Sequence, residues 1–269
     1  MAAKEKKDAN DMSFFEHLDE LRPCIVRSVI AVAVLMVAAF LAKDAIMAIV
    51  MGPKSPDFPT NAAMGMLADA TGSDALRINS GDLTLINTSM AGQLNMHIMI
   101  AFYTALILSL PYVLFELWGF VKPALNDNEL KNGRIFFFNV TLCMIVGVLF
   151  GYFVLAPLSV NFLGGYTVSD EIRNLIDVGS YISLVMNMSL VCALVFELPV
   201  LVYFLSRLGI LTAAFMRRYR RHAIIILAVG AAIITPPDII SMILVVIPMY
   251  LLYELSIGIA ARNEKRVAE

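Results

Sequence analysis

A charged string lies directly before the first long apolar run of the chain. Glu16-His17-Leu18-Asp19-Glu20-Leu21-Arg22 places three carboxylates and one guanidinium at a predicted membrane boundary. One interpretation is an amphipathic helix on the membrane surface, with an apolar face formed by Phe14, Leu18 and Leu21. The other is an acidic ligand-binding site. The pattern alone favours the surface helix.

A single carboxylate interrupts the fourth long apolar run. Glu197 lies in the segment Leu194-Val195-Phe196-Glu197-Leu198-Pro199, where Pro199 loosens the backbone. It could be a protonated or hydrogen-bonded group buried between helices. It could also line a polar groove together with Asn187, which precedes it by close to three helical turns. Because ionisable residues inside a membrane are expensive, a functional role is favoured.

The sequence lacks the motifs of common catalytic sites. It has no P-loop, no HExxH, no GxSxG and no Cys/His cluster with metal-ligand spacing. The histidines are too widely spread for a conventional triad, and the three cysteines lie in apolar runs without CxxC spacing. We therefore expect no enzyme activity, no cofactor and no metal.

The composition indicates a multi-pass membrane protein. Of 269 residues, 59% are hydrophobic and 16% charged, and the mean hydropathy is +0.79. Since Pro236-Pro237 disfavours a continuous helix, the last apolar stretch is predicted as two short helices, 223–236 and 239–253. The fold class is an all-α integral membrane protein with six transmembrane helices, the fifth and sixth short. The apolar stretches are 23–42, 96–118, 135–163, 181–206 and 223–261.

The distribution of basic residues orients these helices. Sixteen of the 20 lysines and arginines fall at the N-terminus, in the loops around 119–134 and 207–222, and at the C-terminus. The positive-inside rule then places both termini in the cytoplasm. We divide the chain into a cytoplasmic segment (1–22), a transmembrane domain (23–261) with a long outer loop (43–95), and a cytoplasmic tail (262–269). The outer side holds only Lys43, Lys54, Arg77 and Arg173.

Four motifs in order resemble those of TatC, the core subunit of the twin-arginine protein translocase. Each motif is weak alone, but the four together, at matching topological positions, are specific. The resemblance covers nearly everything from Phe14 to Ala261 and implies six helices with both termini in the cytoplasm. The motifs are His17-Leu18-Asp19-Glu20-Leu21-Arg22, Trp118-Gly119-Phe120-Val121-Lys122-Pro123-Ala124-Leu125 with Glu129, Phe196-Glu197-Leu198-Pro199, and Thr235-Pro236-Pro237-Asp238.

The resemblance implies roles for individual residues. Glu20 and Glu129 receive the paired arginines of a signal peptide, because guanidinium forks pair bidentately with carboxylates. Arg22 and Phe120 support that site. Glu197 faces the groove into which the hydrophobic part of the signal peptide inserts. On the outer side, the assignments are Pro53 for the structural cap, and Thr235, Pro236, Pro237, Asp238 and Met242 for the outer turn and partner docking.

The chain departs from the family pattern at three places. Met242 stands where many relatives carry Gln, which weakens the polar part of the docking surface and leaves the type of partner open. Asn126-Asp127-Asn128 adds negative charge near the arginine site. The loop 43–95 looks longer than usual and aligns poorly, so only Pro53 is assigned there.

The sequence thus predicts a twin-arginine signal-peptide receptor and scaffold of the Sec-independent translocase. It would export folded proteins across the bacterial cytoplasmic (inner) membrane, driven by the proton gradient. Expected partners are twin-arginine signal peptides, TatA/TatB-type single-span subunits, other TatC copies and membrane lipid, but no nucleic acid. The alternative is a proton-coupled small secondary transporter that uses Glu197. It should show repeat symmetry and broken helices around a midplane site, whereas this sequence has one broken stretch and no repeat.

Overall fold

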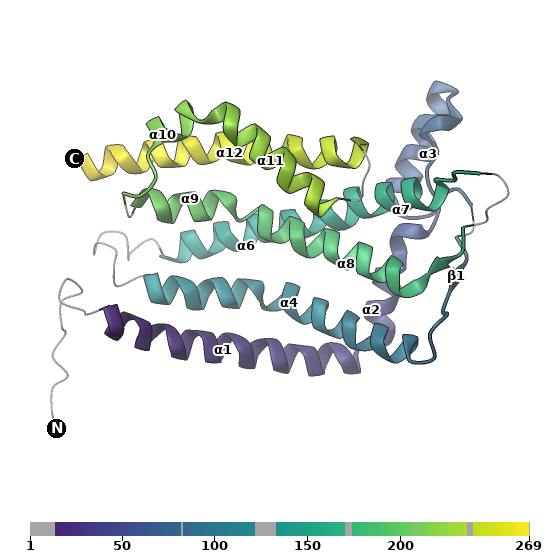
Figure 1. Ribbon diagram of the computed structural model, residues 1–269, viewed down its shortest axis with the longest axis horizontal. Coiled ribbons are helices and arrows are strands. Elements are labelled where there is room, and N and C mark those ends of the chain that lie inside the picture. The colour runs from purple at the N-terminus through teal and green to yellow at the C-terminus, as the bar shows by residue number, and fades with distance from the viewer. Residues whose placement is uncertain are drawn as a thin grey trace.

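Long helices packed side by side form the body of the protein. The structure is a computed structural model, and it describes residues 14–81, 83–121, 133–169, 174–207, 209–235 and 239–268. α1 begins and α12 ends at the same end of the bundle (Figure 1), as expected for termini on one side of a membrane. The main helices are α1 (Phe14–Leu41), α4 (Gly92–Val121), α6 (Gly133–Phe150), α7 (Ala156–Gly165), α8 (Val178–Val195), α9 (Leu198–Arg207), α11 (Arg220–Ile234) and α12 (Ile239–Ala268).

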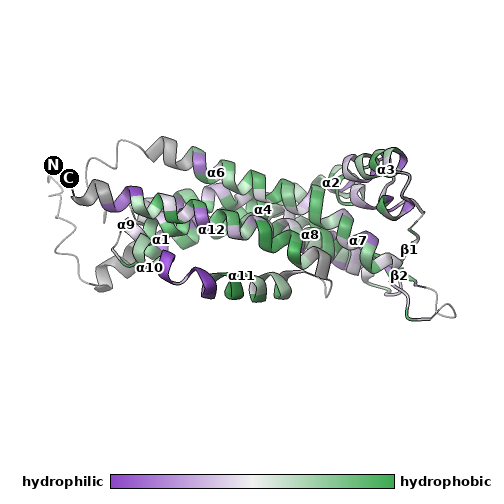
Figure 2. Ribbon diagram, turned by 90° about the horizontal axis from the view of Figure 1, so that it is seen from above, coloured by the Kyte–Doolittle hydropathy of each residue, from purple (hydrophilic) through white to green (hydrophobic). Residues whose placement is uncertain are grey.

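Five helical segments in the described ranges are long and apolar enough to cross a membrane. They match the four long predicted runs and the segment after the proline pair: Leu21–Leu41, Gly92–Gly119, Phe138–Gly165, Val178–Arg207 and Met242–Glu264. α11 takes the place of the predicted short fifth helix. Its 15 residues rise only about 22 Å, against a hydrocarbon core of about 30 Å. Hydrophobic residues fill the middle of the bundle in Figure 2, and hydrophilic residues gather toward its ends.

The last helix is longer than the sequence analysis expected. α12 runs for 30 residues, so the prediction of a short sixth helix ending at residue 253 was wrong. Ile257 and Ala260 are buried against Val202 of α9 and Met216 of α10 (Ala213–Arg218). Burying these apolar side chains stabilises the extra turns. Most of the predicted tail therefore continues α12.

Two helix breaks lie where proline appears in the sequence. α8 ends at Val195 and α9 begins at Leu198, next to Pro199, so Glu197 stands in the gap between them. α11 ends at Ile234 and α12 begins at Ile239. A proline in a helix interior lacks the backbone donor and clashes with the preceding turn, which explains why neither pair of helices is continuous. Residues 236–238 themselves lie outside the described residues.

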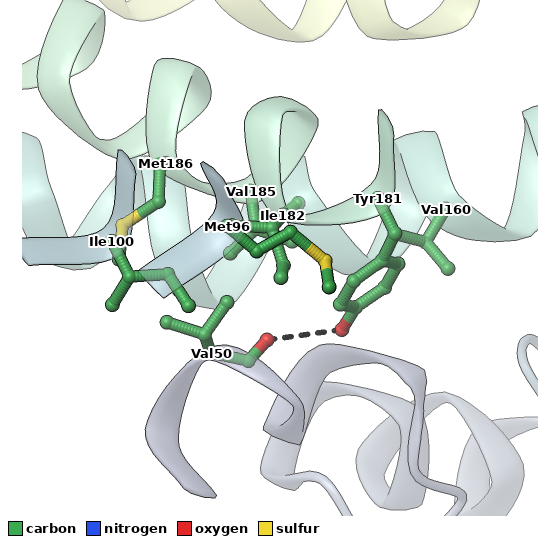
Figure 3. Close-up of a cluster of buried hydrophobic side chains, with 9 residues drawn as sticks. Val50, Met96, Ile100, Val160, Tyr181, Ile182, Val185 and Met186 are labelled. Carbon is green, nitrogen blue, oxygen red and sulfur yellow. Dashed lines mark hydrogen bonds between the residues drawn. The ribbon is translucent and has the colours of Figure 1, made fainter. Parts of the chain in front are cut away.

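The predicted outer loop is folded over the other end of the bundle. It contains α2 (Lys43–Val50), α3 (Pro59–Thr71) and β1 (Leu85–Ile86), which pairs in parallel with β2 (Ile176–Asp177). The Tyr181 hydroxyl of α8 donates to the Val50 carbonyl of α2 across 3.1 Å (Figure 3). Around this bond, a buried apolar cluster includes Met96 and Ile100 of α4. The outer segment is thereby fixed to the membrane helices.

Two glycines allow a close approach between α8 and the helix that faces it. A Cβ atom at Gly147 of α6 would lie 2.6 Å from the Cys192 carbonyl oxygen. A Cβ at Gly151, in the π-helical turn Gly151–Leu155 after α6, would lie 2.5 Å from the Met188 carbonyl oxygen. The glycines are four residues apart and so lie on one face. Small residues at this spacing are a common basis of helix packing in membranes.

We expect Gly151→Ala to lower the free energy of unfolding by about 1–3 kcal/mol, because the new methyl group forces two backbones apart. Thermal unfolding of the detergent-purified protein measures this loss. Gly230→Ala in α11 is the matched control, since a Cβ there meets nothing within 4 Å. A Gly151→Ala variant as stable as the Gly230→Ala variant would contradict this description of the crossing.

Candidate functional site

The side chains of the two carboxylates predicted to bind arginine both lie outside the described residues. Glu129 lies outside the described residues, and the Glu20 and Phe120 side chains are also outside them. The backbone at position 20 belongs to α1, and Arg22, two residues further on, is exposed. α4 ends at Val121, at the end of the bundle where α1 begins (Figure 1). The helix ends that carry the motifs therefore meet, while the pairing of Glu20 with Glu129 stays a prediction.

An ion pair joins α1 and α4 just inside this end of the bundle. The Arg27 guanidinium donates from Nη1 to Oε2 of Glu116 across 3.0 Å. The Tyr112 hydroxyl, one turn earlier on α4, donates to the other carboxylate oxygen across 2.8 Å. Glu116 is buried, whereas the Arg27 side chain is 57% exposed. Both oxygens of a buried carboxylate are thus satisfied inside a membrane span.

The sequence analysis missed this pair. Arg27 and Glu116 both stand in predicted apolar runs, and the rule that flagged Glu197 applies equally to them. A Tyr and a Glu four residues apart on one helix face are a further signal, because side chains at this spacing meet. Their partnership across 89 residues was not visible without the antiparallel packing of α1 and α4.

Glu197 is buried, and it has no hydrogen-bond partner in the part of the chain that the structure describes. Its exposed fraction is 9%, and neither carboxylate oxygen accepts a hydrogen bond from any described residue. Phe196, the residue before it, packs on Phe150 next to the close crossing at Gly147. A buried polar group without a partner costs free energy, so it is a candidate contact for a group that enters from outside.

Asn187 does not form a polar pair with Glu197. Its side-chain oxygen accepts from the Tyr103 hydroxyl of α4 across 2.7 Å, and its amide donates to Ser183 across 3.1 Å. The residue thus fastens α8 to α4. The predicted sharing of one groove by Asn187 and Glu197 has no support in these contacts.

Pro53 lies at the centre of a buried hydrogen-bond network in the outer segment. Its carbonyl accepts from the side-chain amides of Asn61, across 2.9 Å, and of Asn79, across 3.3 Å. The Asn79 amide also donates to the Pro157 carbonyl across 2.9 Å. Asn79 has φ of +47°, a left-handed conformation that asparagine tolerates better than most residues. The network connects Pro53 to α3 and α7, a position consistent with a cap-shaping role.

The described residues of the predicted docking surface have few polar groups available to a partner. Thr235 is buried, and its hydroxyl donates to the Ala231 carbonyl of its own helix across 2.9 Å. Met242 is half-buried and packs on the apolar cluster around Val245. Pro236, Pro237 and Asp238 lie outside the described residues. Arg220 of α11 pairs with Glu254 of α12 across 2.8 Å. Across the described residues, no group of three His, Cys, Asp or Glu side chains could hold a metal ion.

We expect Arg27→Gln to lower the free energy of unfolding by about 1–2 kcal/mol, because it leaves the buried Glu116 carboxylate without its cation. The loss stays below that of a fully buried pair because Arg27 is half-exposed. Thermal unfolding in detergent measures it, with the exposed Arg217→Gln as the control for loss of charge. In the double variant Arg27→Gln/Glu116→Gln, the losses should be less than additive; full additivity would contradict the pair.

Comparisons with known proteins agree over nearly the whole chain. A family model described as Sec-independent protein translocase protein (TatC) matches residues 16–248. The Sec-independent protein translocase protein TatC of Blattabacterium sp. subsp. Periplaneta americana is 37% identical over 97% of this chain and 99% of its own length. TatCy of Bacillus subtilis is 30% identical over 93% and 89%. Two crystal structures of the twin arginine translocase receptor TatC are also similar. The first is 28% identical in sequence, covers 93% of this chain and 100% of its own chain, and has a TM-score of 0.67. The second, in DDM, is 29% identical, covers 90% of this chain and 98% of its own chain, and has a TM-score of 0.72. This chain belongs to the TatC family of Sec-independent protein translocase proteins.

Proposed function

We propose that this chain is the twin-arginine signal-peptide receptor and scaffold of a Sec-independent translocase. Its task is to export folded proteins across the bacterial cytoplasmic membrane, with both termini cytoplasmic and with energy from the proton gradient. The observation that carries the proposal is the family match across residues 16–248. The similarity to crystal structures of the twin arginine translocase receptor TatC supports it. The secondary transporter that uses Glu197 is not retained, because these matches are translocase proteins.

Arginine recognition is assigned to Glu20 and Glu129, on two grounds. The motifs that carry these residues extend from α1 and α4, whose ends meet at one end of the bundle. The nearest described buried acid, Glu116, is already occupied by Arg27 and Tyr112. Glu116 is thus unavailable to an incoming arginine. Carboxylates at the membrane boundary bind a guanidinium more strongly than in open water, because the effective dielectric is lower there.

Deeper insertion is assigned to the region around Glu197. Its buried, unpartnered carboxyl group lies at the break between α8 and α9. A polar atom of an entering peptide would satisfy this group, which no described residue does. Because the recognition residues are at the boundary and Glu197 is within a span, binding divides into an arginine contact followed by insertion.

The partner surface is assigned to α11 and the outer turn. Since Thr235 is engaged with its own helix and Met242 is apolar, the docking surface is mainly hydrophobic. α11 exposes a set of large apolar side chains in keeping with this: Ile225, Ile226, Val229 and Ile233. Single-span TatA/TatB-type subunits and other copies of this chain are the proposed partners. A helix too short for the bilayer favours such association.

We expect Glu20→Ala and Glu129→Ala each to reduce cross-linking of a twin-arginine signal peptide to the membrane-embedded protein by about tenfold, since each removes a charge-assisted hydrogen bond. The reduction should be largest at low salt, where charge attraction is least screened. Asp57→Ala, which removes an exposed acid from the predicted outer side, is the control. Unchanged cross-linking in both site variants would refute the assignment.

Glu197→Gln completes the same experiment. It should leave the initial arginine cross-link intact and reduce only the cross-links formed by the hydrophobic part of the peptide. Loss of the initial contact in this variant would show that the two steps are not separate.

A further inference from the structure

A large cavity opens at the outer end of the bundle, far from the residues assigned to signal-peptide binding. It measures about 1200 Å³ and is lined by residues of α2, the first turns of α4 and the chain around β1. Figure 1 shows these elements together at one end of the bundle. The position of the cavity coincides with a membrane boundary, because the apolar span of α1 ends at Leu41 and that of α4 starts at Gly92. A ligand here would meet polar headgroup surroundings and hydrocarbon at once.

The wall of the cavity has an excess of positive charge. Lys43 and Lys54 line it with a single acid, Asp44, among the described lining residues. Neither lysine forms an ion pair with any described residue, whereas Arg77, elsewhere on the outer side, pairs with Asp69 across 2.6 Å. Basic residues are scarce on the outer side, so two in one cavity form a local concentration. The surplus of one positive charge matches a singly charged anion.

The remaining polar lining consists of groups that can hydrogen-bond an anion or its substituents. Asn87 and Gln93 provide side-chain amides. The His97 side chain already contacts α1, because its Nε2 lies 2.8 Å from the Phe40 carbonyl oxygen and its ring stacks on Phe40. The histidine is therefore part of the wall that joins α4 to α1.

The other part of the cavity lining is apolar. Met47 and Met51 of the α2 segment line it together with Met96 and Ile100, which belong to the buried cluster of Figure 3. Methionine side chains are flexible and adapt to irregular apolar ligands. A cavity lined by both lysines and methionines suits a molecule with an anionic head and a hydrocarbon tail.

We propose that this cavity binds an anionic phospholipid of the outer leaflet, with its phosphodiester between Lys43 and Lys54 and part of an acyl chain against the methionines. A phosphodiester carries one negative charge, which equals the surplus of the described lining. Free phosphate shares the anionic chemistry but makes no use of the apolar wall, so the lipid is the better match. This inference does not depend on the signal-peptide site.

Photo-cross-linking in lipid nanodiscs tests the proposal. The probes are phosphatidylglycerol and phosphatidylcholine with the same diazirine-labelled acyl chain, and mass spectrometry maps the labelled peptides. Phosphatidylglycerol should label the peptides that contain Met47, Met51 and Met96, and phosphatidylcholine should label them much less. Lys43→Gln/Lys54→Gln should reduce this labelling roughly tenfold, given the attraction of each lysine to an anionic lipid.

Arg77→Gln is the control, because it removes an outer-side cation that does not line the cavity. It should leave the labelling unchanged, and equal thermal unfolding of the double lysine variant and the parent verifies that the fold is intact. Equal labelling by both lipids, or labelling unaffected by the double substitution, would overturn the proposal. Complete suppression by millimolar glycerol phosphate would also overturn it, because the site would then recognise a soluble phosphate rather than a lipid.

Discussion

A charged side chain in the hydrocarbon core of a bilayer is costly unless another group pairs with it, and this constraint accounts for the main ionic contacts between the helices. Arg27 with Glu116 joins α1 to α4, and Arg220 with Glu254 joins α11 to α12. Each pair lies toward the predicted cytoplasmic end, where α1 and α11 begin. Glu197 is the contrasting case, a buried carboxyl group that no described residue satisfies. Paired groups here stabilise the fold, and the unpaired one is the candidate for a role in binding.

The two ends of the bundle are built for different tasks. At the outer end, the Pro53 network and the cluster around Val50 hold α2 and α3 over the membrane helices. The other end carries the described parts of the two predicted arginine-binding motifs, at the start of α1 and the end of α4. Between the ends, the close crossing at Gly147 and Gly151 holds α8, the helix that precedes Glu197, against α6. A rigid helix bundle with acidic residues at one boundary suits a receptor that first binds the arginines of a peptide. The same receptor can then bind the hydrophobic segment of that peptide.

Local sequence signals predicted much of this fold. Most of the features that were not predicted depend on contacts between residues distant in sequence. Apolar run length located the four long spans, and the proline pair located the break before α12, because these depend on neighbouring residues only. The break between α8 and α9 was not predicted, since Pro199 was expected only to loosen the backbone of a continuous helix. The length of α12 was missed because it depends on the burial of Ile257 and Ala260 against α9 and α10. The partnership of Arg27 with Glu116 was missed for the same reason. Glu20 and Glu129 were first assigned their roles by motif resemblance, and their side chains lie outside the described residues.

In the proposed function, carboxylates of this chain recognise the paired arginines of a signal peptide. The most direct test compares the binding of a twin-arginine peptide and its twin-lysine version to the full-length protein in lipid nanodiscs. Lysine keeps the positive charge but loses the planar fork that engages a carboxylate bidentately. The account predicts at least about tenfold weaker binding of the twin-lysine peptide, in line with the loss of charge-assisted hydrogen bonds. Equal affinity for the two peptides would contradict it.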